Sequence, residues 1–194
     1  MRRDRAESGC VALSALLVGC LWFCKPALGV VAPTTRYHGL VGNLEKVDTQ
    51  AKRITVRTAE GYERGFSYGG TIAVHGLEGT AQAADLVGKV GSRVVVHYTG
   101  LPGRETAARV DVFGYDALKR TEGRLSEVDK SGRKVAVKTA DGATETFEVA
   151  KDSALDTKHG IVDMVHYTGR AGDPVIIYHT QEGGRKVVRL LKHL

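Results

Sequence analysis

The sequence predicts an all-β protein that contains two tandem five-stranded β-barrels after an N-terminal signal sequence. The first observation behind this prediction is an internal duplication, because the segment Gly42–Gly61 recurs at Gly123–Gly142. The offset of 81 residues holds without a gap to the Gly-Arg pairs at 103–104 and 184–185. The other two observations are the order of elements within each copy and a short apolar leader. A repeat of this length is typical of one structural unit used twice.

The leader, Met1–Gly29, has the features of a secretory signal. Three arginines lie among its first five residues, and the run Cys10–Cys24 is apolar apart from one serine. This run is shorter than the roughly 20 residues that a membrane-spanning helix needs. Cleavage after the small residue Gly29 would release the chain. Two alternatives stay open: lipidation of Cys20, which ends a lipobox-like Leu-Val-Gly-Cys, and an uncleaved membrane anchor.

The distribution of cysteines supports export of a chain that has no disulfide bond. All three cysteines lie in the leader, so the chain after Gly29 has none and must be stabilised by its core. Residues 30–38 form a linker, 39–115 the first barrel and 120–194 the second. We expect the protein in the periplasm or cell envelope of a bacterium, with membrane anchoring as the alternative.

The first strand of each copy should contain a β-bulge. Leu44 and Val47 are three residues apart, as are Leu125 and Val128, whereas side chains on one face of a strand recur every second residue. If all four face the core, each strand needs one extra residue, which is a bulge. Bulges bend strands, and small closed barrels need such bends.

The second strand of each copy shows regular alternation. Residues 53–57 and 134–138 place apolar side chains at every second position, which is typical of a half-buried strand. A turn then follows at Gly61 and at Gly142, where glycine can adopt a positive φ. The third strand carries one phenylalanine in each copy, Phe66 and Phe147.

The remaining elements complete a barrel. An irregular segment follows at 71–87 and 152–168, with a short helix expected at 81–86. Two apolar strands and two closing strands come after it, at 94–98, 106–113, 175–179 and 187–191. Three strands, an irregular or helical connection and two strands is the element order of the OB-type barrel.

The repeated motif also resembles a known family. The pattern G-x-L-x-x-V-D, a V-x-V-x-T hairpin, V-G-x-x-V-x-V and a closing A-x-x-V resembles the tandem OB-like small β-barrel domains of secreted bacterial proteins, a family of unknown function. Its residues in the first copy are Gly42, Leu44, Val47, Asp48, Val56, Thr58, Gly61, Val90, Gly91, Val94, Val96, Ala107 and Val110. The second copy departs from it at Ala171 and Pro174. The resemblance implies a fold and an exported location, and it implies no catalytic residue.

A candidate anion-binding face lies on the second strands. If the apolar residues point inward, Arg53 and Arg57 point outward, and Lys134 and Lys138 repeat this arrangement. Such a face could bind an acidic polysaccharide, lipid phosphates or nucleic acid. The alternative is that these cations form weak pairs with acids on neighbouring strands. The net charge of +6 favours anionic partners without requiring them.

Other functions have less support in the sequence. None of the seven histidines falls in a metal-ligand pattern, so no metal site is predicted, although scattered histidines could still handle copper or zinc. Nucleic-acid binding would need stacking aromatics, and the single tryptophan lies in the leader. Neither a P-loop nor a dinucleotide fingerprint occurs. We therefore expect an exported, non-catalytic envelope binding or scaffold protein without a cofactor, whose partner is an anionic envelope component or a protein. The alternatives are a periplasmic metal-handling protein and an OB-type nucleic-acid-binding protein.

Overall fold

The computed structural model describes residues 35–76, 81–114 and 116–194. The leader, with its expected cleavage site and Cys20, lies outside these residues. Within the described ranges, no helix has the length and apolar character that crossing a membrane requires. The fold there is almost entirely β, as the sequence predicts, with two closed barrels that follow one another along the chain.

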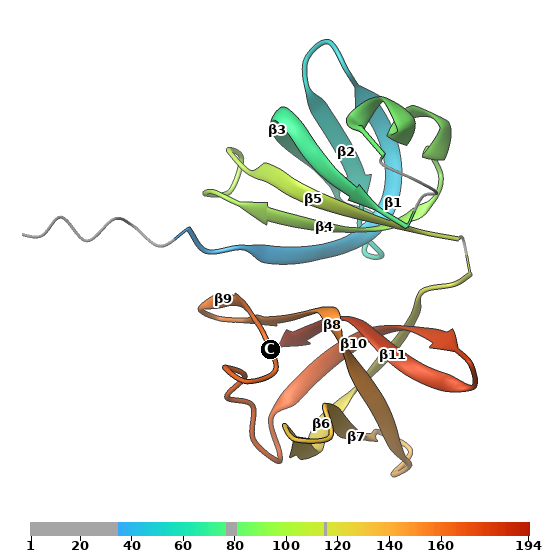
Figure 1. Ribbon diagram of the computed structural model, residues 1–194, viewed down its shortest axis with the longest axis vertical. Coiled ribbons are helices and arrows are strands. Elements are labelled where there is room, and N and C mark those ends of the chain that lie inside the picture. The colour runs from blue at the N-terminus through green and yellow to red at the C-terminus, as the bar shows by residue number, and fades with distance from the viewer. Residues whose placement is uncertain (1–34, 77–80, 115) are drawn as a thin grey trace, which may run out of the picture. The chain divides into compact units, whose positions relative to one another are not determined.

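The first barrel closes in the order β1-β2-β3-β5-β4. β3 and β5 are parallel, and the other neighbours are antiparallel. Figure 1 shows these strands in blue to yellow-green, with the short 3-10 helix η1 between β3 and β4. The elements are β1 (His38–Asp48), β2 (Arg53–Arg57), β3 (Glu63–His75), η1 (Ala83–Lys89), β4 (Arg93–Thr99) and β5 (Thr106–Phe113).

The second barrel repeats this pairing. Its strands run in the order β11-β10-β6-β7-β8, and a parallel pairing of β8 with β11 closes the ring. A sixth strand, β9, pairs with β8, which the sequence did not predict. In the first copy the corresponding contact is the single bridge Val74–Ala81. The elements are β6 (Lys119–Asp129), β7 (Lys134–Thr139), β8 (Thr144–Thr157), β9 (Gly160–Val162), β10 (Pro174–Glu182) and β11 (Arg185–His193).

Both predicted bulges are present. The register between β1 and β2 shifts after Leu44, and the register between β6 and β7 shifts after Leu125. Glu45 and Ser126 are the extra residues, and they point away from the core into solvent. The bulge prediction is therefore confirmed in both copies.

The first glycine of the repeated motif is required by close approach of the backbone. A Cβ atom on Gly42 would lie 2.4 Å from the carbonyl oxygen of Arg57, and one on Gly123 would lie 2.3 Å from that of Lys138. Backbone atoms cannot move aside cheaply, so a side chain at either position would force the strands apart.

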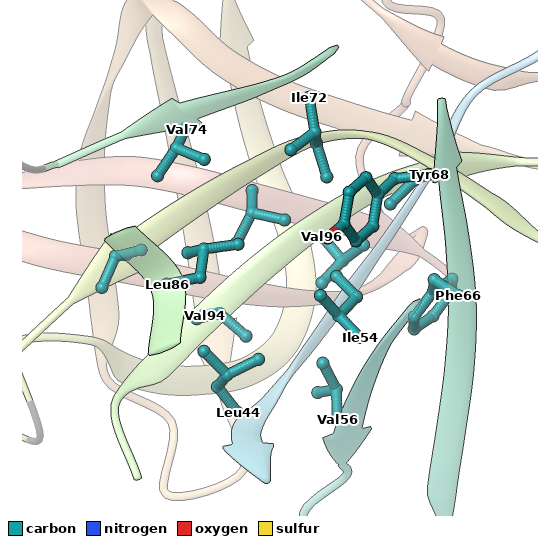
Figure 2. Packing of buried hydrophobic residues seen from close by; sticks show 13 residues of the cluster. Leu44, Ile54, Val56, Phe66, Tyr68, Ile72, Val74, Leu86, Val94 and Val96 are labelled. Carbon is teal, nitrogen blue, oxygen red and sulfur yellow. The ribbon is translucent and has the colours of Figure 1, made fainter. Parts of the chain in front are cut away.

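Each barrel encloses its own core. In the first, Leu86 of η1 joins side chains from all five strands, as Figure 2 shows. The helix lies slightly later than the predicted 81–86, and Asp85 accepts a hydrogen bond from the backbone of Gln82 to begin it. The second barrel has turns instead of a helix there, and Tyr167 is the buried residue that corresponds to Leu86. β-branched residues such as Val162 and Val165 disfavour a helix in this copy.

Candidate functional site

The four predicted anion-binding residues all lie on the outer surface of a barrel. Arg53 and Arg57 are the exposed ends of β2, and Lys134 and Lys138 are exposed on β7. The alternation that predicted their outward direction is therefore confirmed. Their surroundings, however, differ strongly from one cation to the next.

In the first barrel the cations face acids. The Arg57 guanidinium forms ion pairs with Glu45 at 2.9 Å and with Glu63 at 3.0 Å. Arg53 lies opposite Asp48 on β1, and its guanidinium lies over Gly65, where a Cβ would be only 2.5 Å away. The weak-pairing alternative therefore describes Arg57, whereas Arg53 has an acid as its cross-strand neighbour but, among the described residues, no ion pair within 4.0 Å.

Lys134 of the second barrel is also flanked by acids. Its direct neighbour on β6 is Asp129, and its direct neighbour on β8 is Glu148. Opposite charges at such positions attract each other, and the effect on the free energy of unfolding is about 0.2–1 kcal/mol per pair. Lys134 therefore lies beside two acids in the register, although among the described residues its ammonium forms no ion pair within 4.0 Å and Glu148 is paired with Arg185.

Lys138 has a different environment, because the two copies differ in charge around it. Its neighbour on β6 is the cation Arg124, and its neighbour on β8 is Thr144. The acids that hold Arg57 in the first copy, Glu45 and Glu63, correspond to serine and threonine here. In the part of the chain that the structure describes, neither Lys138 nor Arg124 forms an ion pair within 4.0 Å.

A groove of about 510 Å³ lies over this cation pair. Its lining residues come from β6, from the end of β7 with the residue that follows it, and from the start of β10. The Arg124 guanidinium donates a hydrogen bond of 2.9 Å to the carbonyl oxygen of Gly172, which fixes its position at the groove. The lining residues are Glu122, Gly123, Arg124, Lys138, Thr139, Ala140 and Pro174.

Arg124 is the site residue that the sequence analysis missed. It corresponds to Asn43 at the 81-residue offset, so a comparison of charges between the copies could have identified it. Lys138 was identified as an outward-facing cation, but the residues beside it, Arg124 and Thr144, follow only from the cross-strand register. Arg53, Arg57 and Lys134 do not line this groove.

One motif with a catalytic association also escaped the sequence analysis. Residues Gly65–Gly69 match G-x-S-x-G, the pattern of a hydrolase nucleophile elbow, which needs a sharp turn from strand to helix. Here the motif lies within the continuous strand β3. The Ser67 hydroxyl donates a hydrogen bond to the carbonyl oxygen of Glu105 and lies 3.3 Å from the Thr106 hydroxyl. Among the described residues, none of its hydrogen bonds involves a histidine.

Each barrel contains a partly buried ion pair at matching positions of the repeat, and its charges are inverted between the copies. Arg64 contacts Glu105 at 2.6 Å in the first barrel. At the corresponding positions of the second barrel, Glu145 contacts Lys186 at 2.9 Å. Hydrogen bonding from the Lys186 ammonium is the main cause that lowers the pKa of Glu145.

Each of these ion pairs covers an aromatic pair. The rings of Phe66 and Tyr98 are 5.1 Å apart, and those of Phe147 and His179 are 5.0 Å apart. A cation lies over the phenylalanine ring in both cases: Arg64 lies 5.7 Å from the centre of the Phe66 ring, and Lys186 lies 5.6 Å from the centre of the Phe147 ring. Burial lowers the pKa of His179, which favours the neutral imidazole. These contacts stabilise the two barrels, and they hold Arg64 and Lys186 against a carboxylate and an aromatic ring.

A third charged cluster surrounds Asp111 on the first barrel. Its carboxylate contacts His97 at 2.8 Å, the Arg109 guanidinium at 2.6 and 2.7 Å and His75 at 3.4 Å. Burial raises the pKa of this carboxyl, but the hydrogen bonds from His97 and Arg109 outweigh burial and lower it to about 2. An arginine in direct contact is unfavourable for a metal cation at the same carboxylate. Within the described ranges, no group of three histidine, cysteine or acidic residues could hold a metal ion.

Comparison with known proteins gives structural similarity only. No protein-family model matches the chain, and no curated protein matches it. Among solved structures, apo-CusF from Escherichia coli is 14% identical, covers 40% of this chain and 87% of its own, and has a TM-score of 0.31. Silver-bound CusF from the same organism is 14% identical, covers 40% and 91%, and also has a TM-score of 0.31. At this identity, nothing about metal binding passes from CusF to this chain.

Proposed function

We propose that the chain is an exported, non-catalytic binding protein of the bacterial cell envelope, and that its second barrel binds an acidic ligand at Arg124 and Lys138. One observation carries the proposal. Around Lys138, the second copy has two hydroxyl residues and an arginine where the first copy has two acids and an asparagine around Arg57, while the strand pairing is the same.

The energetics of the cation pair support a ligand there. Like charges directly opposite each other on neighbouring strands destabilise a sheet by about 0.2–1 kcal/mol. Arg124 and Lys138 hold this arrangement beside a groove, where an anion would contact both at once. Grooves on OB-type barrels are common ligand sites. The signal-like leader supports the envelope location.

The first test is salt-dependent retention of the native protein on an anionic resin. The double variant R124Q/K138Q should elute at clearly lower salt, because it removes two cations from one site. The matched control K134Q removes a cation from the same strand and the same face, but one flanked by Asp129 and Glu148. Equal shifts per charge for both variants would show a diffuse electrostatic effect and would contradict the proposed site.

The duplication also allows a gain-of-function test. The variant N43R/E45S/E63T gives the first barrel the residues that surround Lys138 in the second. We expect it to create a second anion site, so that the stoichiometry of bound anion rises from one to two in a calorimetric titration. An unchanged stoichiometry, in a variant that retains its far-UV circular dichroism spectrum, would argue against the proposal.

A further inference from the structure

Acidic side chains border the cation pair on the second barrel. Glu122 lines the groove two residues from Arg124 on the same face of β6, and it is ion-paired with Arg120. Asp141 lies in the β7–β8 turn beyond the groove wall. Hydrogen bonding from Thr139 is the main cause that lowers the pKa of Asp141, so this carboxylate is charged at neutral pH.

The other end of β7 is acidic as well. Lys134 is four residues from Lys138, a distance of about 13 Å along a strand. Its cross-strand neighbours are Asp129 and Glu148. A ligand that extended from the groove in this direction would meet these two carboxylates, of which Glu148 is also paired with Arg185 at 3.1 Å. On this face of β7, Lys138 is thus the cation whose direct cross-strand neighbours include no acid.

The remaining lining residues are small, and all of them except Thr139 are apolar. The apolar ones are Gly123, Ala140 and Pro174. Gly123 cannot be replaced by a larger residue, because a Cβ would lie 2.3 Å from the Lys138 carbonyl oxygen. The groove thus combines one anion-binding point with apolar contact area.

From this arrangement we infer that the groove binds one compact anionic group, a phosphate or a carboxylate, attached to an apolar body, and that polyanions are not its ligands. The inference rests on the proposed function, since it names the ligand class of the same site. The two cations bind the anionic group, and the proline and alanine contact the body. The surrounding acids repel any chain that carries further negative charges.

The test is a titration of the native protein with four probes: inorganic phosphate, phenyl phosphate, benzoate and heparin oligosaccharides of increasing length. We expect phenyl phosphate to bind at least threefold tighter than inorganic phosphate, because its ring contacts Pro174. Comparison of the affinities for phenyl phosphate and benzoate shows whether the site prefers a phosphate or a carboxylate as the anionic group. Affinity for heparin fragments should not rise with their length. Amide chemical shifts should change at Gly123, Lys138 and Ala140.

Two sets of variants sharpen the test. R124Q/K138Q should abolish binding of phenyl phosphate, whereas K134Q should leave it unchanged. Removal of the acidic border in E122Q/D141N should increase the affinity for long heparin fragments severalfold, by a larger factor than it increases the affinity for phenyl phosphate.

The outcomes separate the inference from the proposed function. Heparin affinity that rises with length in the unmodified protein, and that is lost in R124Q/K138Q, would overturn the inference while the proposed function stands. Equal affinities for inorganic phosphate and phenyl phosphate would also overturn it, because the apolar walls would then contribute nothing. Absence of binding by all four probes would contradict both.

Discussion

The charge inversion between the ion pairs Arg64–Glu105 and Glu145–Lys186 makes a quantitative prediction about stability. The Glu105 side chain is 4% exposed and that of Arg64 is 35% exposed. Glu105 also accepts a hydrogen bond of 2.8 Å from the backbone of Gly103. Loss of one partner from a buried pair costs about 3–5 kcal/mol, and the partial exposure of Arg64 reduces this to about 2–3 kcal/mol. R64E and E105K should each lower the free energy of unfolding by about this amount.

The double variant R64E/E105K should recover most of the loss, because it recreates the arrangement of Glu145 and Lys186 on the same backbone. A deficit of about 1 kcal/mol should remain, since a lysine cannot accept the hydrogen bond from Gly103. Urea unfolding of the full chain, followed by circular dichroism, gives a double-mutant cycle whose coupling free energy should exceed about 2 kcal/mol.

The matched control is the exposed pair of Glu148 and Arg185, which lies 3.1 Å apart. Its inverted double variant E148R/R185E should show a coupling below about 1 kcal/mol. If R64E/E105K is as unstable as the sum of its single variants, the inverted pair of the second barrel is not an equivalent solution, and the argument from the duplication is wrong.

Three further predictions concern other buried groups. The folded-state pKa of Asp111, about 2, lies below the unfolded value near 3.9, so about 2 kcal/mol of stability present above pH 4 is lost between pH 4 and pH 2. D111N should remove this loss when the free energy of unfolding is measured against pH. An unchanged loss of stability at low pH in D111N would contradict the prediction. G42A should lower the free energy of unfolding by about 1–3 kcal/mol, whereas G88A, where a Cβ meets nothing within 4 Å, should change it by less than about 1 kcal/mol; similar losses would show that close approach is not the reason for the glycine. Y167F should raise the melting temperature, because the buried phenol oxygen has no hydrogen-bond partner among the described residues and an unsatisfied hydroxyl costs about 1–3 kcal/mol; a lower melting temperature would mean that the hydroxyl is satisfied.

The sequence predicted the features of the fold that depend on local periodicity. The three-residue spacing of Leu44 and Val47 predicted a bulge, and the element order predicted the barrel. The extra strand β9 was missed because its three residues carry no alternation long enough to recognise. The helix was predicted for the first copy only, and the substitution of Tyr167 for Leu86 in the second barrel could not be foreseen without the packing of its core.

The candidate site was predicted only in part, because a cation on a strand is defined by its neighbours across the sheet. Periodicity gave the outward direction of Lys134 and Lys138 equally. The register then shows Lys134 between two acids and Lys138 between Arg124 and a threonine. A shift of one residue would have changed each of these neighbours. Sequence alone could therefore name the face but not the residue.

Comparison of matching positions in the two copies distinguishes charges that stabilise the barrel from charges that we propose to bind a ligand. Where a charge changes between the copies and its partner changes sign with it, as at Arg64 and Glu145, the interaction is preserved and the requirement comes from the fold. Around Lys138 the cation is kept while its acidic partners disappear and a second cation is added. The change adds one contact within the barrel, the hydrogen bond from Arg124 to the Gly172 carbonyl oxygen, but it adds no acid that would offset the two adjacent cations. Under the proposed function, an anion in the groove supplies that negative charge.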